Sequence, residues 1–415
     1  MNPLKFYIAL VLCLAGIPVS AKRIIVNPGG PVKSVNLAIS LAAAGDTILV
    51  KSGIYREGNI TINKPLVFIG EGRPVLDGEM KHEVFTINAD GVSISGFRII
   101  NSGVSSVKDL AGIGAINTDR LVIRNNEFAE TFFGIHISNS RNSIIENNRL
   151  LVSARSEYEI GNGIHLWQST QATIRNNYVS GHRDGIYFEF VTSSRIEGNT
   201  CERNQRYGLH FMFSHDDEYH RNSFRENGAG VAVMYTRNVT MTYNLFEKNW
   251  GNSVYGLLLK DISDSKVTNN RFVQNTIAVY MEGTSRTEFS ENIFTSNGWG
   301  IRLQASCDAN TFTRNNFTRN TFDFATNGTL VLNTINGNYW DKYQGYDLNK
   351  DGIGDVPYRP VNMYTMVVER IPTAVLLWRS FLVFLLDRAE KVFPAVTPEN
   401  LKDEYPNLRP HDFNT

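Results

Sequence analysis

Residues 208–230, GLHFMFSHDDEYHRNSFRENGAG, contain one complete period of a repeat. Apolar residues alternate with other residues after Gly208, and Asn222 follows fourteen residues after that Gly. Alternation with a period of two predicts a short strand with one face toward a core. Phe224 stands two residues after the Asn, and the next strand-opening Gly is Gly230.

The same pattern runs along most of the chain. An Asn recurs ten times in steps of 22 or 23 residues, apart from one step of 29 and one of 26, at positions 126, 148, 177, 199, 222, 244, 270, 292, 315 and 338. The residues two positions after these Asn are Phe128, Leu150, Val179, Cys201, Phe224, Phe246, Phe272, Phe294, Phe317 and Trp340. Such a period is typical of a solenoid, in which each coil buries its inner face only by stacking on its neighbours. The sequence therefore predicts an all-β chain folded as a right-handed parallel β-helix.

The recurring Asn are interpreted as scaffold. An Asn at the same inward corner of every coil can pass amide hydrogen bonds from one coil to the next and satisfy the turning backbone. The apolar residues two positions further on should form a core stack beside this ladder.

The amino terminus predicts export and a cap. An apolar run ends in Val19-Ser20-Ala21, the small residues at which signal peptidase cuts, so residues 1–21 should be a signal peptide that sends the chain to the periplasm. The run is too short for a comfortable membrane span. Residues 22–111 should form an N-terminal cap and irregular coils, with an amphipathic cap helix over residues 32–44. The regular coils should occupy residues 112–340.

Composition adds two exclusions. The formal net charge of the 415 residues is zero, which gives no reason to expect nucleic-acid binding. Cys201 and Cys307 lie several coils apart. Each coil adds about 4.8 Å, so the distance between them exceeds the span of a disulfide, and none is expected.

Functional chemistry has to use the outward positions, and the repeat identifies them. Two residues after the repeat Gly, the outward column reads Gly114, His136, His165, Tyr187, His210, Ala232, Leu258, Tyr280 and Arg302. Four residues after it, the next column reads Ile116, Ser138, Trp167, Glu189, Met212, Met234, Lys260, Glu282 and Gln304. Only eight His occur in the chain, and three of them stand in the first column. An ordinary exposed sheet rich in aromatic and polar residues explains this pattern, and so does a metal-binding face.

Met212 and Met234 make the metal hypothesis specific, because they occupy one column on successive coils. Their thioethers can approach closely, since neighbouring strands lie about 4.8 Å apart. Thioether is a soft ligand suited to Cu(I), and imidazole suits copper in either oxidation state. We therefore expect transient copper binding by Met212, Met234, His210, His165 and His136. The longer inter-strand stretches at 151–161 and 248–255 should form a wall beside these strands.

Residues 341–364, after the last coil, form an Asp/Gly-rich loop. The loop places oxygen ligands at alternate positions and has Gly352 for a tight turn, as a calcium loop does, but Tyr358 stands where an EF-hand has an acid. Calcium binding and a plain turn cluster both remain open. The candidate calcium ligands are Asp347, Asn349, Asp351 and Asp355.

Residues 365–415 are expected to form a hydrophobic helical docking segment and an extended tail. Arg379 within the apolar stretch argues against a transmembrane helix. One interpretation is a cap over the last coil. The apolar residues exceed what one cap needs, which suggests a membrane-embedded partner or the membrane surface, and the two interpretations are compatible and carry equal weight. The residues expected to dock are Leu376, Trp378, Phe381 and Phe384.

Several stretches taken together resemble the NosD family. They are Gly163-Ile-His-Leu-Trp167, Gly208-Leu-His-Phe-Met-Phe-Ser214, Gly230-Val-Ala-Val-Met-Tyr235, residues 338–358 and the Leu-rich end with Asp387-Arg-Ala-Glu-Lys391. The resemblance implies a periplasmic, non-enzymatic subunit attached to an ABC transporter made of the permease NosY and the ATPase NosF. It also implies that the chain acts with the copper chaperone NosL to load the copper–sulfur centres of apo nitrous oxide reductase, an enzyme of denitrification.

The competing class is an extracytoplasmic polysaccharide lyase, hydrolase or carbohydrate-binding protein, which is a common use of β-helices. Side chains that could line a sugar groove are Tyr187, Glu189, Lys260, Tyr280, Glu282 and Arg302. Hydrolysis needs two carboxylates about 5 to 9.5 Å apart. Glu189 and Glu282 lie four coils apart, which corresponds to about 19 Å. The sequence therefore favours a copper-handling protein over an enzyme.

Overall fold

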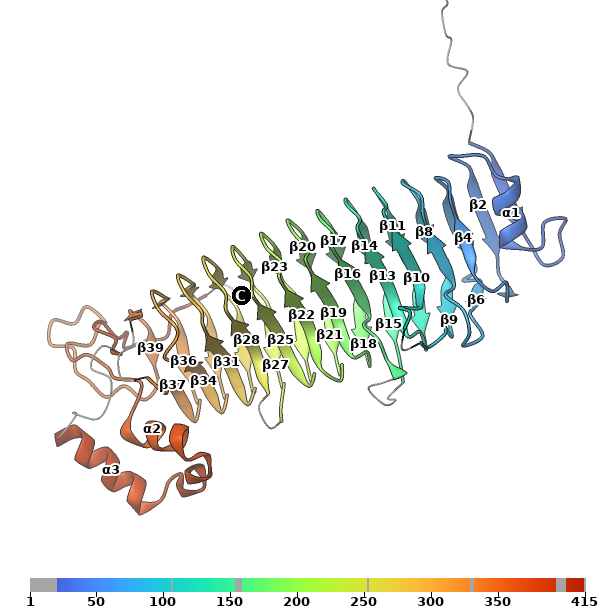
Figure 1. Cartoon of the computed structure of the whole chain (residues 1–415). Helices are drawn as coiled ribbons and strands as arrows, with labels where there is room; N and C mark the ends of the chain where they lie inside the picture. The colour runs from blue at the N-terminus through green and yellow to red at the C-terminus, as the bar shows by residue number, and fades with distance from the viewer. Residues whose placement is uncertain are drawn as a thin grey trace, which may run out of the picture.

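The computed structural model describes residues 21–105, 107–153, 159–251, 254–328, 332–392 and 401–413. The chain is a parallel β-helix whose successive coils add strands to three long sheets of 14, 12 and 13 strands (Figure 1). The predicted fold class is confirmed. All but the last residue of the expected signal peptide lies outside the described residues.

We call the three sheets A, B and C. Sheet A contains β1 (Arg23–Val26), β2 (Thr47–Lys51), β5 (Val67–Glu71), β8 (Ser93–Ser95), β11 (Val122–Arg124), β14 (Ile144–Glu146), β17 (Thr173–Arg175), β20 (Arg195–Glu197), β23 (Glu218–His220), β26 (Thr240–Thr242), β29 (Lys266–Thr268), β32 (Glu288–Ser290), β35 (Thr311–Thr313) and β38 (Thr334–Asn336). Sheet B contains β3 (Ile54–Tyr55), β6 (Val75–Asp77), β9 (Arg98–Ile100), β12 (Glu127–Ala129), β15 (Arg149–Leu151), β18 (Tyr178–Ser180), β21 (Thr200–Glu202), β24 (Ser223–Arg225), β27 (Leu245–Glu247), β30 (Arg271–Val273), β33 (Ile293–Thr295), β36 (Asn316–Thr318) and β39 (Tyr339–Trp340). Sheet C, which carries the predicted outward columns, contains β4 (Ile60–Ile62), β7 (Phe85–Ile87), β10 (Ala111–Ile116), β13 (Phe133–Ser138), β16 (Ile164–Trp167), β19 (Asp184–Glu189), β22 (Tyr207–Met212), β25 (Ala229–Met234), β28 (Tyr255–Lys260), β31 (Ile277–Glu282), β34 (Trp299–Leu303) and β37 (Phe322–Thr326).

The ten recurring Asn form the predicted ladder at the corner between sheets A and B. Each rung follows one pattern: the Oδ1 of Asn244 accepts from the backbone N–H and the Nδ2 of Asn222, at 2.9 and 3.0 Å. The Nδ2 of Asn222 also donates to the carbonyl of Ile196 at 2.9 Å. All ten Asn are buried. The interpretation of these residues as scaffold is confirmed, because their side-chain amides are hydrogen-bonded to one another and to the backbone of neighbouring coils.

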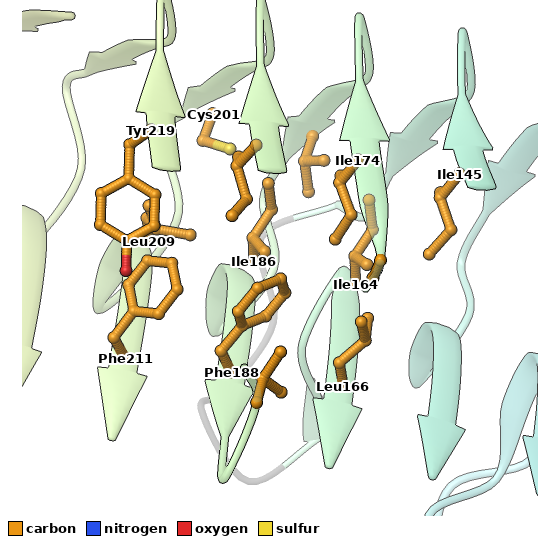
Figure 2. Packing of buried hydrophobic residues seen from close by; sticks show 14 of the residues in the cluster. Ile145, Ile164, Leu166, Ile174, Ile186, Phe188, Cys201, Leu209, Phe211 and Tyr219 are labelled. Atoms are coloured by element: carbon orange, nitrogen blue, oxygen red, sulfur yellow. The ribbon is translucent and has the colours of Figure 1, made fainter. Parts of the chain in front are cut away.

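The apolar residues beside the ladder form the predicted core stack. The rings of Phe246, Phe272, Phe294 and Phe317 are nearly parallel, with centroids 4.6 to 4.9 Å apart. Figure 2 shows the neighbouring Ile, Leu and Phe side chains meeting inside the coils, together with Cys201. Cys201 and Cys307 are both buried and free, so they form no disulfide, as expected.

The N-terminal end is covered by α1 (Val35–Leu41), which lies within the predicted range and is shorter. The helix begins after Ser34, whose Oγ accepts a hydrogen bond from the N–H of Leu37 at 3.1 Å. Val35 and Ala38 are its buried residues. The helix packs against β1, β2 and β4, and so covers the end of the core.

The C-terminal tail closes the other end. Asp403 is fully buried. Its carboxylate accepts hydrogen bonds from the N–H of Gly337, from the N–H and Nδ2 of Asn338 and from the indole N–H of Trp340, at 2.8 to 3.1 Å. Asp403 thereby takes the position of the next ladder residue. The sequence predicted an extended tail and did not predict that Asp403 in this tail would hydrogen-bond to the last coil.

The apolar segment before the tail forms α2 (Met363–Arg370), η2 (Pro372–Leu377) and α3 (Phe381–Val392). We call residues 363–392 the helical arm. The arm lies beside the last coils, where Tyr364, Val368 and Val383 pack with Phe322 of β37 (Figure 1). Across the described ranges, no helix has the length and apolarity needed to span a bilayer.

Candidate metal site

The outward columns of sheet C follow the predicted register. Backbone pairing orders the first column as Gly114, His136, His165, Tyr187, His210, Ala232, Leu258, Tyr280 and Arg302. It orders the second as Ile116, Ser138, Trp167, Glu189, Met212, Met234, Lys260 and Glu282. The repeat located these side chains because the buried inner face sets the register of each strand.

His136 and His165 form a close imidazole pair near the N-terminal part of the face. Their ring centroids are 4.8 Å apart, and Phe133 packs against both rings at 5.5 and 5.6 Å. Both ring nitrogens of His165 are buried and lack a hydrogen-bond partner among the described residues. Burial lowers the pKa of His136 and lowers that of His165 well below its usual value. Both rings are therefore neutral at physiological pH, which is the form that binds metals.

A cavity of about 620 Å³ opens beside His136, and its lining includes Glu83 and Asp109. The carboxylate of Glu83 occupies the space that a side chain at Gly114 would need, because a Cβ there would stand 2.5 Å from Glu83 Oε2. Burial raises the pKa of Glu83, against the hydrogen bonds from Thr86 and the backbone of Ala111. Carboxylates therefore adjoin the imidazole pair on its open side.

His210 is held by an internal network. Its Nδ1 lies 3.3 Å from Arg206 Nη2 and 3.5 Å from Asp184 Oδ2, and only 5% of the residue is exposed. Burial opposes ionisation of Asp184, but hydrogen bonds from His210 and Arg206 prevail and lower the pKa of its carboxyl group. The Nε2 of His210 is buried and has no partner among the described residues. Of the two ring nitrogens of His210, only Nε2 lies outside this network.

Met212 and Met234 pair across β22 and β25, as expected, and both are partly exposed. The hydroxyl of Tyr187 lies 3.6 Å from the sulfur of Met212 and 3.3 Å from Oε2 of Glu189, and can donate to either. Burial, reinforced by Glu189, raises the pKa of Tyr187 to about 12, so the hydroxyl keeps its proton. The polar neighbours orient the Met212 thioether while leaving sulfur lone-pair density for a soft cation.

The candidate copper residues form two groups separated by β19. His165 and Met212 stand two strands apart, or about 10 Å at the usual spacing, which is beyond one coordination sphere. No group of three or more His, Cys, Asp or Glu within the described ranges could hold a metal ion. The face offers separated positions with few ligands each, and these hold a metal less firmly than a closed four-ligand site.

The expected wall beside this face is only partly described. Residues 154–158 and 252–253 lie outside the described ranges. Trp250, at the start of the second stretch, is 59% exposed. The wall stays a prediction.

The candidate calcium residues Asp347, Asn349, Asp351 and Asp355 gather in one turn. Their carboxylates accept backbone N–H groups from the turn itself: Asp347 from Gly352 at 2.9 Å, Asp351 from Ile353 at 2.8 Å and Asp355 from Leu348 at 2.6 Å. Tyr358 packs against Trp340, with ring centroids 5.2 Å apart. These bonds stabilise the turn with or without calcium, and calcium binding stays a prediction.

The four candidate docking residues differ in exposure. Leu376, Phe381 and Phe384 are 86%, 73% and 52% exposed and give the helical arm an apolar outer face. Trp378 is 37% exposed and packs against Phe322, with ring centroids 5.1 Å apart. Trp378 therefore anchors the arm on β37. Their role in docking stays a prediction.

The carboxylates considered for polysaccharide hydrolysis are far apart. Glu189 lies on β19 and Glu282 on β31, and β22, β25 and β28 separate these strands. The adjacent residues Asp216 and Asp217 form no such pair either. Asp217 is buried, and its carboxylate accepts a hydrogen bond from the N–H of Ser194 at 2.8 Å. Burial raises the pKa of Asp217 to about 8. Its neighbour Asp216 is exposed. These residues do not supply the carboxylate pair that glycoside hydrolysis requires.

Fold and face together describe an elongated parallel β-helix whose sheet C presents thioether and imidazole side chains in register. Residues 151–345 match the family model described as periplasmic copper-binding protein (NosD). The probable ABC transporter binding protein NosD of Pseudomonas aeruginosa is 29% identical over 387 residues, covering 85% of this chain and 86% of that protein. The same-named protein of Stutzerimonas stutzeri is 27% identical over 377 residues, covering 85% of each. The chain is thus similar to the NosD family over residues 151–345 and to these two relatives over most of its length.

Solved structures are similar in fold alone. The catalytic unit of a GH87 α-1,3-glucanase from Streptomyces thermodiastaticus superposes with a TM-score of 0.62 at 16% identity, covering 79% of this chain and 70% of that one. The names of the NosD relatives describe binding proteins and not catalysts.

Proposed function

We propose that this chain is a periplasmic accessory subunit of an ABC transporter complex that assists copper delivery and copper–sulfur centre assembly in nitrous oxide reductase. One observation carries the proposal: Met212 and Met234 stand in register on a face that also holds the neutral pair His136 and His165. Thioethers select reduced copper, and neutral imidazoles accept copper in either state. The match of residues 151–345 to the family model described as periplasmic copper-binding protein (NosD) also supports copper as the metal.

Copper is the cargo of this face. The open side of the imidazole pair, with Glu83 and Asp109 in the adjacent cavity, suits the entry of a cation. The Met pair suits exchange of Cu(I) with another protein, because a site with few ligands lets a partner's ligands enter the same coordination sphere. When copper takes the Met212 sulfur, the Tyr187 hydroxyl retains Glu189 as its acceptor.

The exposed face of the helical arm suits attachment to the membrane permease NosY, which works with the ATPase NosF. Leu376, Phe381 and Phe384 are the side chains available for this contact. The copper chaperone NosL would supply the metal, and the apo reductase would receive it. The turn at residues 347–355 would order the end of the solenoid, with calcium where calcium is bound.

The test replaces Met212 and Met234 together by Leu. Leu keeps the volume and the apolarity, so the stability should change by less than about 1.5 kcal/mol. Reductase made in that strain should lack copper by elemental analysis, and His210→Ala should reduce its copper content too. Met281→Leu is the matched control, because Met281 points inward from β31 and is fully buried. Fully copper-loaded reductase from the double variant would overturn the site assignment.

A further inference from the structure

The turn that follows each of the eight sheet C strands from β10 to β31 contains one residue in the left-handed backbone region. The equivalent residues are Asn117, Asn139, Gln168, Phe190, Phe213, Tyr235, Asp261 and Gly283, with φ between 47° and 59°. The first seven share one hydrogen bond, in which the backbone N–H donates to the carbonyl one coil later, as Phe213 does to Met234 at 3.1 Å. Asn, Asp and Gly tolerate this conformation, whereas bulky side chains rarely adopt it.

Three aromatic residues nevertheless occupy this position on consecutive coils. Phe190, Phe213 and Tyr235 directly follow Glu189, Met212 and Met234 along the chain. The three rings are 45%, 37% and 39% exposed. Neither backbone preference nor core packing favours an exposed aromatic residue here. A strained and exposed aromatic strip on three consecutive coils, two of which carry the Met pair, indicates use in binding.

The geometry of the three rings restricts what they can bind. Phe190 stacks on Phe213 with centroids 5.1 Å apart and planes 9° apart, and Phe213 stacks on Tyr235 at 5.0 Å and 13°. The inner ring faces therefore cover one another, and the strip presents ring edges along its length. Sugars and nucleobases bind aromatic residues by stacking on faces, so the strip suits neither. Ring edges make favourable contacts with thioether sulfur and pack against aliphatic side chains.

We propose that Phe190, Phe213 and Tyr235 form a docking strip for the apolar rim of a partner protein that exchanges Cu(I) with Met212 and Met234. This inference rests on the proposed function. Direct exchange requires ligands of both proteins around one ion, so the partner's metal site has to lie over the Met pair and the adjoining strip. Three coils span about 10 Å, and a contact of that length fits a brief transfer encounter.

The experiment replaces all three aromatic residues by Asn in the otherwise intact protein. Asn is chosen because Asn117 and Asn139 occupy the equivalent position on other coils. The melting temperature should hold or rise, since the backbone strain is removed. The probe is the soluble part of NosL loaded with Cu(I), and its dissociation constant should rise at least tenfold by calorimetry. The Cu(I) affinity of the variant alone, measured against a chromophoric Cu(I) chelator, should stay within twofold.

The matched control is Tyr243→Asn. Tyr243 is also aromatic, has φ of 57° and is 43% exposed, but it follows a sheet A strand at a different corner. Its replacement should leave the NosL dissociation constant within twofold. An equal loss in this control would overturn the proposal, since the effect would then not be specific to the strip.

Three further outcomes are decisive. The docking proposal is overturned if the triple variant binds NosL within twofold of wild type, or if wild type does not bind NosL. It is also overturned if the triple variant loses Cu(I) affinity, because the rings would then belong to the metal site. Retained Cu(I) affinity in the Met212→Leu/Met234→Leu variant would instead count against the proposed function, so the two failures are distinguishable.

Discussion

The inner and outer surfaces of the same coils follow different rules. The inward corner repeats Asn on ten coils, whereas the outward column of sheet C changes from Gly114 through His165 and Tyr187 to Arg302. Every inner position meets the equivalent residues one coil above and below, so hydrogen bonding demands Asn in the ladder and packing demands an apolar side chain beside it. The outer positions are free of that demand. Positions that repeat the same kind of residue on every coil therefore indicate the scaffold, and outer positions that vary from coil to coil indicate candidate functional residues.

Breaking one inner rung should have the largest effect on stability. Asn244→Leu removes the side-chain partners of the Asn222 N–H and of the Tyr219 carbonyl, and it removes one of the two acceptors of Asn222 Nδ2. At about 1–3 kcal/mol for each unsatisfied buried group, we expect a loss of about 3–5 kcal/mol in the free energy of unfolding. Met234→Leu, at a partly exposed outer position, should cost less than about 1.5 kcal/mol. Equal losses in urea denaturation would contradict the division between the two faces.

Lowering the pH should destabilise the inner surface through protonation of His182. This residue is fully buried, and burial lowers its pKa to about 4, against about 6.5 in an unfolded chain. The unfolded state binds the proton more readily, so the stabilisation is present above pH 6.5 and declines as the pH falls toward 4, by up to about 3 kcal/mol. Melting temperatures measured from pH 7 to pH 4 should fall less in His182→Asn than in wild type. Parallel curves would assign the acid sensitivity elsewhere, first to the half-buried pair His136 and His165.

Substitutions on the exposed face of the helical arm should affect partner binding and leave the stability of the fold nearly unchanged. Replacing Leu376, Phe381 and Phe384 by Ser removes exposed apolar groups, so each change should alter stability by no more than about 0.5 kcal/mol. Co-purification with the membrane permease should be lost. Asp403→Ala is the contrasting variant, because it breaks the end of the ladder and should destabilise the fold while leaving the arm's apolar face intact. Retained co-purification of the triple Ser variant would remove the docking role.

The smallest expected effect concerns the turn at residues 347–355. If calcium binds there, a chelator should lower the melting temperature by a few degrees, because a ligand that binds only the folded state stabilises it. Asp351→Ala should lower the melting temperature similarly and remove the response to the chelator. A wild-type protein that ignores the chelator would leave this segment a turn held by its own hydrogen bonds.

Most of the scaffold is readable in the sequence, because the inner surface is periodic. The period identified the first ladder, the core stack and the two outward columns. A second ladder stands five residues after the first and is equally periodic, although the sequence-based expectation does not include it. Its members are Asn204, Asn227, Asn249, Asn275, Asn297 and Asn320. His182 occupies the same position one coil earlier and donates its N–H to Asn204 at 3.1 Å. Its burial is therefore a scaffold feature.

The sequence by itself thus determined the β-helix, its register and the face on which His and Met gather, because a repeat makes each coil predict the next. Only the tertiary structure decided how those side chains are used. It engaged Nδ1 of His210 with Arg206 and Asp184, and it returned Asp403 to the last rung of the Asn ladder. These contacts join residues through the final packing and not through the period. No repeat carries them, so they emerge only when the whole chain is folded.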